Sequence, residues 1–515
     1  MANFKVGKNI LENLTTGMYN DSRIIYREYI QNACDQIDIA VKTGLLRKEE
    51  AKIEIWIDSD DTRQITIKDN ATGIPATDFK QTLGDIANSG KTRGESKGFR
   101  GIGRLAGLAY CKKLIFTSKY SGEKEKSLMI CDAVKLRQML NENTRYTLED
   151  VWESVVEYDT ENSDNLTEHF FQVELCGINE ENLPLLNKEE IEEYLSFVAP
   201  LPYDNNFMFY KKIYDHAKEI GYEISEYHIQ LNGKQLFKNY SSRLYDRSNG
   251  NRKTYDEIHD LVFKDFRKDD GSLIAWMWYG ISGFEKQIPS ENAQRGIRLR
   301  CSNIQIGGAN TLSECSPTNP LFKEQRGNYY FVGEVFSVDK NLIPNSQRDY
   351  FNENETRIEF EDALRIYFYD ELHKLYYNAS AIKSNFKHID QYEEKRREFA
   401  KGEFINPEQK QKYEDELEKS RQEAEKARKK LEKYSEEGDD PISIIYKIHK
   451  HKYSKSKENT PAHQQTEKTK YTTQKLSKLS RTERKTVSTI LAIIKEETTQ
   501  EIFERIQQRI IDALK

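Results

Sequence analysis

The sequence predicts an α+β protein in which helices cover one face of a largely antiparallel sheet. Apolar residues recur at helical spacing up to about residue 45. Short β-rich runs follow, namely KIEIWID, RQITIKD, KLIFTSK, SLMICD and FFQVEL. A second block, from roughly residue 190 to 385, carries the strand candidates YHIQL, SLIAWMWYG, GIRLRCSNIQIG and YYFVGEVFSV and ends in a helix from about Thr356. This block is large enough to form a second domain.

Composition limits the kinds of partner. The 515 residues are too many for one core, which predicts two or three domains. With 79 basic and 85 acidic residues, the net charge of -6 gives no global attraction to nucleic acid or membrane, so such a contact would need a local patch. Scattered cysteines without a C-x-x-C pair argue against zinc or disulfides. With no secretory signal or membrane span in the sequence, we expect a cytoplasmic protein.

The expected organisation has five parts. Mixed charges at i,i+4 spacing predict a solvated helix after the second block, with one arm of a coiled coil as the alternative. A polar, slightly basic stretch then predicts a linker. The last segment regains apolar helical periodicity, which requires a dimer contact or an intrachain partner. The expected parts are a first domain (1–185), a second domain (186–385), a charged long helix or coiled coil (386–440), a flexible linker (441–480) and an amphipathic helix (481–515).

The segment SRIIYREYIQNACDQIDIAV predicts a helix with Asp21 or Ser22 as its N-cap. Glu28, Asn32 and Asp35 are spaced i, i+4 and i+7, so they share one narrow stripe. The opposite side carries the predicted core positions Tyr26, Ile30, Ala33, Ile37 and Val41. Taken alone, the polar stripe is also typical of the solvated face of an amphipathic helix.

The order of the motifs that follow makes the pattern specific. After R-E-x-x-x-N-x-x-D come DNATGIP, then GDIANSGKT, then KGFRGIGRLAG. This series resembles the GHKL ATPases, which include gyrase B, the ninety-kilodalton heat-shock chaperone, histidine kinases and MutL. The HtpG-type chaperone branch is the most similar, and the resemblance is dense over residues 5 to 120.

The resemblance implies a Bergerat-type domain that binds and hydrolyses ATP with Mg²⁺. Glu28 would be the general base that orients the attacking water, and Asn32 would coordinate the Mg²⁺. Asp69 would accept a hydrogen bond from the adenine amino group, with Gly73 letting the backbone pass close to the base. Asp35 would be a supporting polar contact near the adenine. Phosphoryl transfer depends mainly on positioning and charge neutralisation, so one carboxylate and one metal can suffice.

A glycine-punctuated segment, residues 84–97, is typical of a mobile cover over the nucleotide. The glycines after it bracket the expected start of a helix at RLAGLAY, where free N–H groups favour phosphate. The residues expected to contact the nucleotide in this region are Ser89, Gly90, Lys91, Thr92, Gly98, Gly101, Ile102 and Gly103.

Two departures from the family pattern and one competing motif accompany the resemblance. Ala71 replaces the first glycine of D-x-G-x-G, which is tolerable unless that position needs a positive φ. Thr167 is the candidate for the family's late threonine, although the surrounding residues do not align cleanly. The run DIANSGKT also resembles a P-loop with Asp85 in place of the first glycine, but a P-loop requires a preceding strand and an immediately following helix.

In the second block, IPNSQRD resembles the middle domain of the same chaperone class. There an asparagine is followed three residues later by an arginine that reaches the γ-phosphate, and Asn345 and Arg348 match this spacing. Arg348 would stabilise charge in the transition state and make hydrolysis depend on domain docking. The alternative is that Arg348 is an ordinary loop arginine.

The expected function is therefore Mg-dependent ATP hydrolysis that drives a chaperone-like clamp cycle. A homodimer is expected, acting on protein clients or on a partner effector subunit. One alternative is an ATP-driven switch for a nuclease or another nucleic-acid-acting partner, MutL-like or MORC-like, in a setting such as bacterial defence. Another is a scaffold that binds ATP without turnover. Basic stretches around Lys447 to Lys478 support the nucleic-acid alternative, and a solvated linker explains them equally well.

Overall fold

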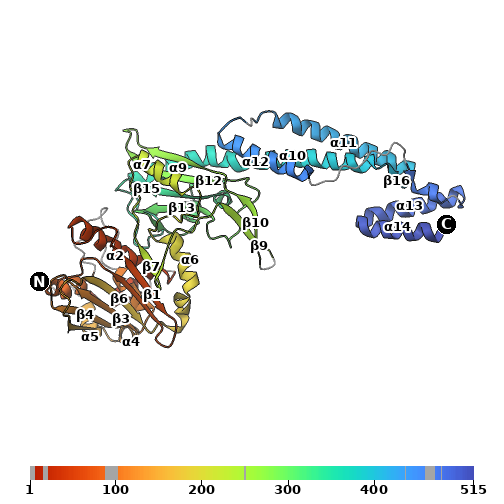
Figure 1. Ribbon diagram of the computed structural model, residues 1–515. Coiled ribbons are helices and arrows are strands. Elements are labelled where there is room, and N and C mark those ends of the chain that lie inside the picture. Colours follow the sequence, from red (N-terminus) through yellow and green to blue (C-terminus); the bar gives the residue numbers. More distant parts are fainter. Residues whose placement is uncertain are drawn as a thin grey trace. The chain divides into compact units, whose positions relative to one another are not determined.

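The computed structural model describes residues 6–15, 21–86, 103–248, 251–434, 437–458, 470–476 and 478–514 (Figure 1). The chain forms two compact units. The first comprises Met1–Gly280 and Lys286–His373, and the second comprises Ile281–Glu285 and Lys374–Lys515.

An eight-stranded sheet forms the base of the first unit, in the order β5-β4-β3-β6-β2-β1-β7-β8. Its paired strands are antiparallel except for β1 and β7, which are parallel. The predicted α+β class is confirmed, and all five β-rich runs of the first domain are strands. The sheet consists of β1 (Ile53–Asp58), β2 (Gln64–Asp69), β3 (Lys113–Lys119), β4 (Glu125–Asp132), β5 (Val156–Asn162), β6 (Phe170–Cys176), β7 (Ile229–Leu231) and β8 (Lys234–Gln235).

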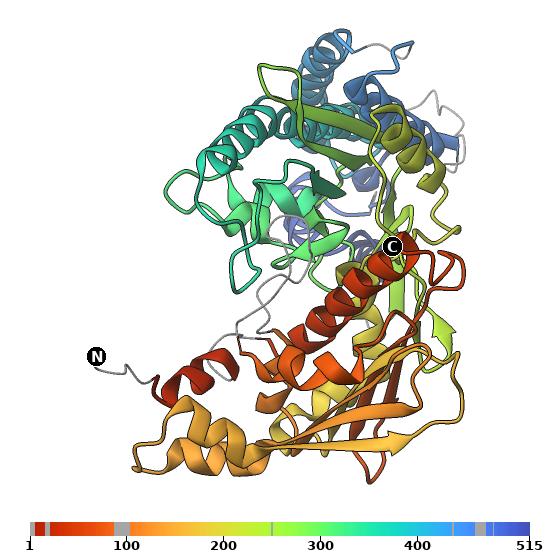
Figure 2. The ribbon, with the colours of Figure 1, turned by 90° about the vertical axis from the view of Figure 1, so that its left-hand side faces the viewer.

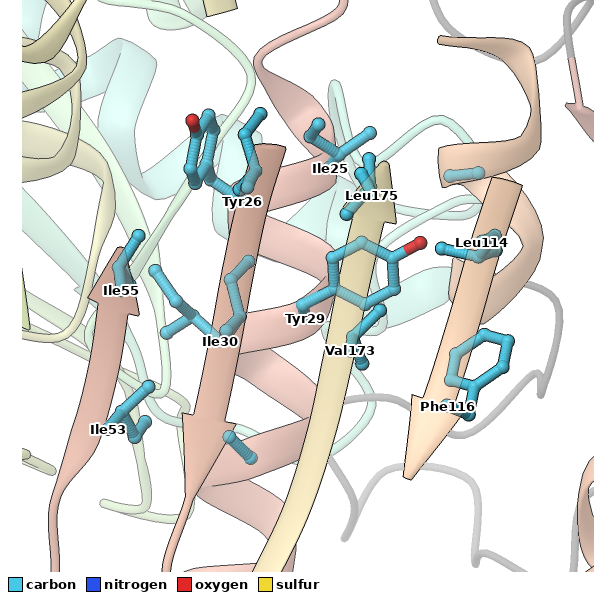
Figure 3. Close-up of a cluster of buried hydrophobic side chains, with 14 of the residues drawn as sticks. Ile25, Tyr26, Tyr29, Ile30, Ile53, Ile55, Leu114, Phe116, Val173 and Leu175 are labelled. Atoms are coloured by element: carbon cyan, nitrogen blue, oxygen red, sulfur yellow. The ribbon is translucent and has the colours of Figure 1, made fainter. Parts of the chain in front are cut away.

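Helix α2 (Ile24–Lys42) lies along one face of this sheet (Figures 1 and 2). Its side chains Tyr29 and Ile30 point toward strand residues such as Ile55, Val173 and Leu114 in one buried cluster (Figure 3). The predicted core stripe is thereby confirmed at Tyr26, Ile30, Ala33 and Ile37. The other helical elements of this region are α1 (Asn9–Thr15), α3 (Ala76–Gly84), η1 (Gly103–Ala109), α4 (Ala133–Asn141), α5 (Leu148–Val155), η2 (Glu180–Leu186) and α6 (Lys188–Val198).

The start of α2 differs from the prediction. The N-cap is Arg23, whose side chain caps no backbone group, so the expected N-cap at Asp21 or Ser22 is wrong. The Asp21 carboxylate instead accepts the Arg23 backbone N–H at 3.0 Å and pairs with the Arg23 guanidinium. Asp21 therefore closes the turn that leads into the helix.

A five-stranded sheet, β11-β12-β15-β13-β14, forms the second layer of the same unit. At its centre, the buried Glu334 carboxylate binds Arg300 and Lys238. Burial alone would raise the pKa of Glu334, but Arg300 and Lys238 outweigh it and hold the pKa at about 2. The five strands are β11 (Asp260–Arg267), β12 (Leu273–Ile281), β13 (Gly296–Cys301), β14 (Ile304–Ile306) and β15 (Val332–Ser337). A separate two-stranded sheet pairs β9 (Arg243–Ser248) with β10 (Asn251–Glu257). The helical elements of this region are α7 (Tyr210–Glu219), α8 (Thr311–Glu314), η3 (Gln325–Tyr330), α9 (Glu355–Tyr367) and η4 (Phe368–Leu372).

The first sheet extends beyond the expected boundary at residue 185. Strand β7, predicted as part of the second block, pairs with β1. Helix α6 also contributes Ile191 and Leu195 to the same buried cluster as α2. The first core is therefore completed by chain that follows residue 185.

The second unit is largely helical, as expected of the C-terminal region. The charged segment forms two helices, because Gly402 adopts a positive φ and Asn406 caps a new helix that starts at Pro407. Ion pairs Lys395–Glu416 and Glu393–Arg428, both at 3.8 Å, join the two helices. The elements are α10 (His373–Ala400), β16 (Glu403–Phe404), α11 (Pro407–Leu431), α12 (Pro441–Glu458), β17 (Lys470–Tyr471), η5 (Thr472–Lys475), α13 (Arg481–Glu497) and α14 (Gln500–Leu514).

The expected linker, 441–480, begins instead with α12, and its residues 459–469 lie outside the described parts. The expected C-terminal helix is two helices, α13 and α14, because the extended Thr498 ends the first. Their apolar residues Leu491 and Phe503 pack with Ile405, which is an intrachain contact.

Two further observations concern the whole chain. Of the helices in the described segments, none is both long and apolar enough to cross a membrane. All six cysteines are free thiols.

Candidate functional site

Three of the predicted site residues meet at the first turns of α2. Glu28 is only 4% exposed, and its Oε1 forms an ion pair with Arg348, with Nε at 2.7 Å. The backbone of Gly103 lies against the other carboxylate oxygen, because a Cβ at this glycine would be 2.1 Å from Glu28 Oε2. Glu28 is therefore held between a glycine of the first domain and an arginine of the second layer.

Tyr29 anchors the segment that carries Gly103. The Tyr29 hydroxyl donates to the Arg104 carbonyl at 3.0 Å and accepts the Gly107 N–H at 3.1 Å. Position 107 favours glycine, because a Cβ there would lie 2.5 Å from the Tyr29 hydroxyl oxygen. The expected helix at RLAGLAY is a short 3-10 helix, η1, that begins at Gly103.

The loop before α9 presents Arg348 in a constrained backbone conformation. Arg348 has φ +55°, and its carbonyl accepts the Gly307 N–H at 2.8 Å. The Arg348 N–H donates to the Asn345 carbonyl at 3.2 Å, and the Asn345 side chain donates to Asp349 at 2.5 Å. A non-glycine residue at positive φ is costly, and such positions cluster at functional sites. Asn345 thus shapes the turn, and Arg348 points from it to Glu28.

Asp69 lies buried at the end of β2, at the other end of α2 from Arg348. Burial raises the pKa of Asp69 to about 7, although the Ala71 and Phe171 N–H groups partly oppose this rise. The turn after it needs Gly73, which has φ +66° and whose Cβ would lie 2.1 Å from the Lys119 carbonyl oxygen. Ala71 is buried, and the positive φ of this turn falls at Gly73, so the replacement of the family's glycine by Ala71 is accommodated.

Three side chains that the sequence analysis missed fix this turn. Thr72 Oγ1 donates to Gln36 Oε1 on α2 at 3.0 Å. His169 Nδ1 lies 2.7 Å from the Ala71 carbonyl, so this nitrogen carries the donated proton. Ser118 Oγ accepts the Ile74 N–H at 2.7 Å. His169 and Ser118 lie far from this turn in the sequence, so no local spacing could have indicated them.

The polar stripe of α2 connects the two ends of the site. Asp35 is 6% exposed and Asn32 is half-buried, so this stripe is not a solvated helix face. From Glu28 to Gln36, which contacts the turn after Asp69, the helix rises by about 12 Å. A bound nucleoside triphosphate could span such a distance from base to terminal phosphate.

The described side chains alone do not form a complete site for Mg²⁺, and phosphate oxygens of a bound nucleotide would have to supply further ligands. Within the described ranges, no group of three or more His, Cys, Asp and Glu side chains could hold a metal ion. Mg²⁺ commonly takes one or two protein ligands together with phosphate oxygens and waters. Asn32 could supply such a protein ligand beside a bound triphosphate.

Several predicted contacts lie outside the described residues. These are the cover segment from residue 87 onward, with Ser89, Gly90, Lys91 and Thr92, and then Gly98, Gly101 and Ile102.

The element before DIANSGKT is the helix α3, so the strand that a P-loop requires does not precede this run. Thr167, the candidate for the family's late threonine, is exposed, and its side chain donates to Asn165 Oδ1. The residue of β6 that lies opposite Asp69 is Phe171.

Comparison with known proteins identifies the type of domain in which these residues lie. Residues 27–161 match the family model of the histidine kinase-, DNA gyrase B-, and HSP90-like ATPases. This segment contains Glu28, Asn32, Asp35, Asp69 and Gly73. The chain therefore carries a GHKL-type ATPase domain, and the predicted resemblance is confirmed.

Within this class, the chain is similar to proteins named chaperone protein HtpG. It is 36% identical over 88 residues to that of Coxiella burnetii (strain RSA 331 / Henzerling II), which is 16% of this chain and 14% of the relative. It is 30% identical over 132 residues to that of Halalkalibacterium halodurans (22% and 21%) and 31% identical over 136 residues to that of Chromobacterium violaceum (23% and 21%). The chain thus covers about a fifth or less of the length of these relatives.

Proposed function

We propose that this chain binds ATP along the polar stripe of α2 and hydrolyses it to ADP and phosphate. The observation that carries the proposal is the buried cluster of Glu28, Gly103 and Arg348 at one end of α2. Farther along α2, the buried Asp69 carboxylate beside the turn at Gly73 is the group that would accept from the adenine amino group. In this proposal the adenine lies near Asp69 and the terminal phosphate lies near Glu28.

In this proposal Glu28 accepts the proton of the water that attacks the terminal phosphorus, as the bond to the ADP oxygen breaks. Asn32 holds Mg²⁺, which neutralises charge on the phosphates. In this structure Arg348 forms an ion pair with the Glu28 carboxylate. Transfer of Arg348 from Glu28 to the terminal phosphate would release the base and place a positive charge where negative charge develops.

The purpose of turnover is proposed to be a conformational cycle of a chaperone-like clamp, in a homodimer that acts on protein clients or on a partner subunit. The similarity to chaperones named HtpG supports this role. For the nucleic-acid alternative the structure adds nothing, because Lys447 and Lys452 of the basic stretch already contact Asp439 and Glu285.

An ATPase assay of the purified chain tests the proposal. We expect Glu28→Ala to bind ATP but to turn it over about a hundredfold or more slowly, since a general base contributes that much. Asp69→Asn should lose ATP binding, because the adenine contact is replaced by an amide donor. Glu49→Ala, which removes an exposed carboxylate, is the matched control and should behave as the parent. Unchanged turnover in Glu28→Ala would show that the assigned base is wrong.

A further inference from the structure

A cavity lies in the first unit, on the side of α2 that faces the five-stranded sheet. Its volume is about 490 Å³. The walls come from the start of α2, from α6, from β13 and β14, and from the loop that carries Arg348. A cavity of this size falls within the range of small-molecule sites.

Buried arginines form the inner wall of this cavity. Arg27 is 4% exposed and Arg298 is 6% exposed, and Arg348 lies beside them. Arg27 reaches only the Gln305 and Gln347 carbonyls, at 3.4 and 3.5 Å. Arg298 donates to the Gln305 side chain at 2.7 Å and to the Ala293 carbonyl.

Across the described ranges, neither Arg27 nor Arg298 has a carboxylate oxygen within the 4.0 Å of an ion pair. The Nε atoms of Arg27 and Arg298 are buried, and neither has a hydrogen-bond acceptor among the residues that the structure describes. Burial lowers the pKa of Arg298 to about 10, which reflects the cost of a charge removed from water.

The carboxylates of the cavity are at its exposed rim. Asp21, Glu190, Glu193 and Asp349 line it, and all four residues are exposed to solvent. Asp21 pairs with Arg23, Glu190 accepts from Asn187, and Asp349 accepts from Asn345. Water and salt screen charges at such a rim, so these groups compensate little of the buried positive charge.

We propose that this cavity is a binding site for a small phosphate-bearing anion, held by Arg27 and Arg298. A buried, uncompensated charge is costly, and an anion bound between the two groups would remove that cost. Guanidinium forks match the oxygens of phosphate with paired, charge-assisted hydrogen bonds. The ligand is inorganic phosphate or a small phosphate monoester.

Arg348 connects this site to Glu28. Arg348 is one of the residues that line the cavity, and its Nε lies 2.7 Å from Glu28 Oε1. A bound anion would compete with Glu28 for Arg348. If Glu28 acts as the proposed base, which is the one step here that rests on the proposed function, occupancy of the cavity would change the rate of ATP hydrolysis.

Isothermal titration calorimetry of the full chain tests the site, with inorganic phosphate in one arm and glycerol phosphate in the other, both at matched ionic strength in chloride. We expect saturable binding with one site per chain, and the tighter arm identifies the ligand class. Arg27→Gln and Arg298→Gln should each weaken binding about tenfold or more, which is the loss expected for a charge-assisted contact. Arg252→Gln, an exposed arginine on β10, removes the same charge and should leave binding unchanged.

A saturating non-hydrolysable ATP analogue, which fills the phosphate end of the nucleotide site, separates the two sites. Phosphate binding should persist with the analogue bound, and its loss there would place the anion in the nucleotide site and overturn the proposal. The proposal also fails if the parent shows no saturable binding, or if Arg252→Gln weakens binding as much as Arg27→Gln. Circular dichroism checks the fold of each variant, and Arg27→Gln decides alone if Arg298→Gln does not fold. Phosphate binding in a chain without ATPase activity would refute the proposed function and leave this site intact.

Discussion

At the scale of single residues, the burial of Asp69 makes stability depend on pH. Its pKa is about 7 in the folded protein and near 3.8 when exposed. Between these values the folded chain keeps a proton that the unfolded chain has released, so the Asp69 contribution to the free energy of unfolding falls as pH rises. Asp69→Asn removes this dependence. We expect the stability of the variant relative to the parent to increase by roughly 1 kcal/mol per pH unit across this window.

Urea denaturation from about pH 4 to about pH 8 measures this difference. Asp58→Asn is the control, because hydrogen bonds from Thr62 and the Asp60 N–H hold the pKa of the exposed Asp58 below its usual value. Its relative stability should not rise with pH in the same window. A flat difference for Asp69→Asn would mean that Asp69 is ionised throughout.

The glycine after Asp69 is a second residue-scale prediction. Gly73→Ala must place a Cβ 2.1 Å from the Lys119 carbonyl oxygen at φ +66°, so backbone has to move. Gly122 has φ +86° but open space around it, so Gly122→Ala measures the cost of the positive φ without the steric clash. We expect Gly122→Ala to lose about 1 kcal/mol of unfolding free energy and Gly73→Ala at least about 3 kcal/mol. Thermal and urea denaturation check both, and equal losses would contradict the close packing at Gly73.

At the scale of elements, α6 belongs to the core of the first sheet although it follows residue 185. Leu195 on α6 is fully buried, whereas Leu183 on η2 is 40% exposed. Leu195→Ala should therefore lower the free energy of unfolding by about 2 to 5 kcal/mol, since it leaves a cavity. Leu183→Ala should change it by less than about 0.5 kcal/mol. Similar losses in urea denaturation would show that α6 does not complete this core.

At the scale of the whole molecule, the two compact units predict two unfolding transitions. The first unit holds both large sheets and the candidate site, and the second is largely helical with its own small core at Ile405, Leu491 and Phe503. A ligand stabilises only the unit that it binds. Scanning calorimetry with Mg-ADP should therefore raise the midpoint of one transition and leave the other in place.

Asp69→Asn provides the control for this experiment, because the shift should disappear when the adenine contact is removed. A single transition that moves as a whole would show that the two units unfold together, contrary to the expectation from their separate cores.

Local pattern in the sequence determined much of this protein. Helical and strand periodicity placed α2 and the strands β1 to β4 and β6, because these segments have long, regular apolar spacing. The motif order then identified the ATPase domain and its candidate residues. Spacing along one helix is enough to align Glu28, Asn32 and Asp35, since helix geometry is local.

Only the tertiary structure decided which distant segments meet. The run YHIQL predicted a strand, but its alternation does not indicate that β7 lies beside β1 in the first sheet. The contact between Glu28 and Arg348, and the arginine-lined cavity beside it, depend on how the layer around the second sheet packs against α2. Such contacts arise from the packing of surfaces far apart in the chain, and no local propensity of either segment specifies them.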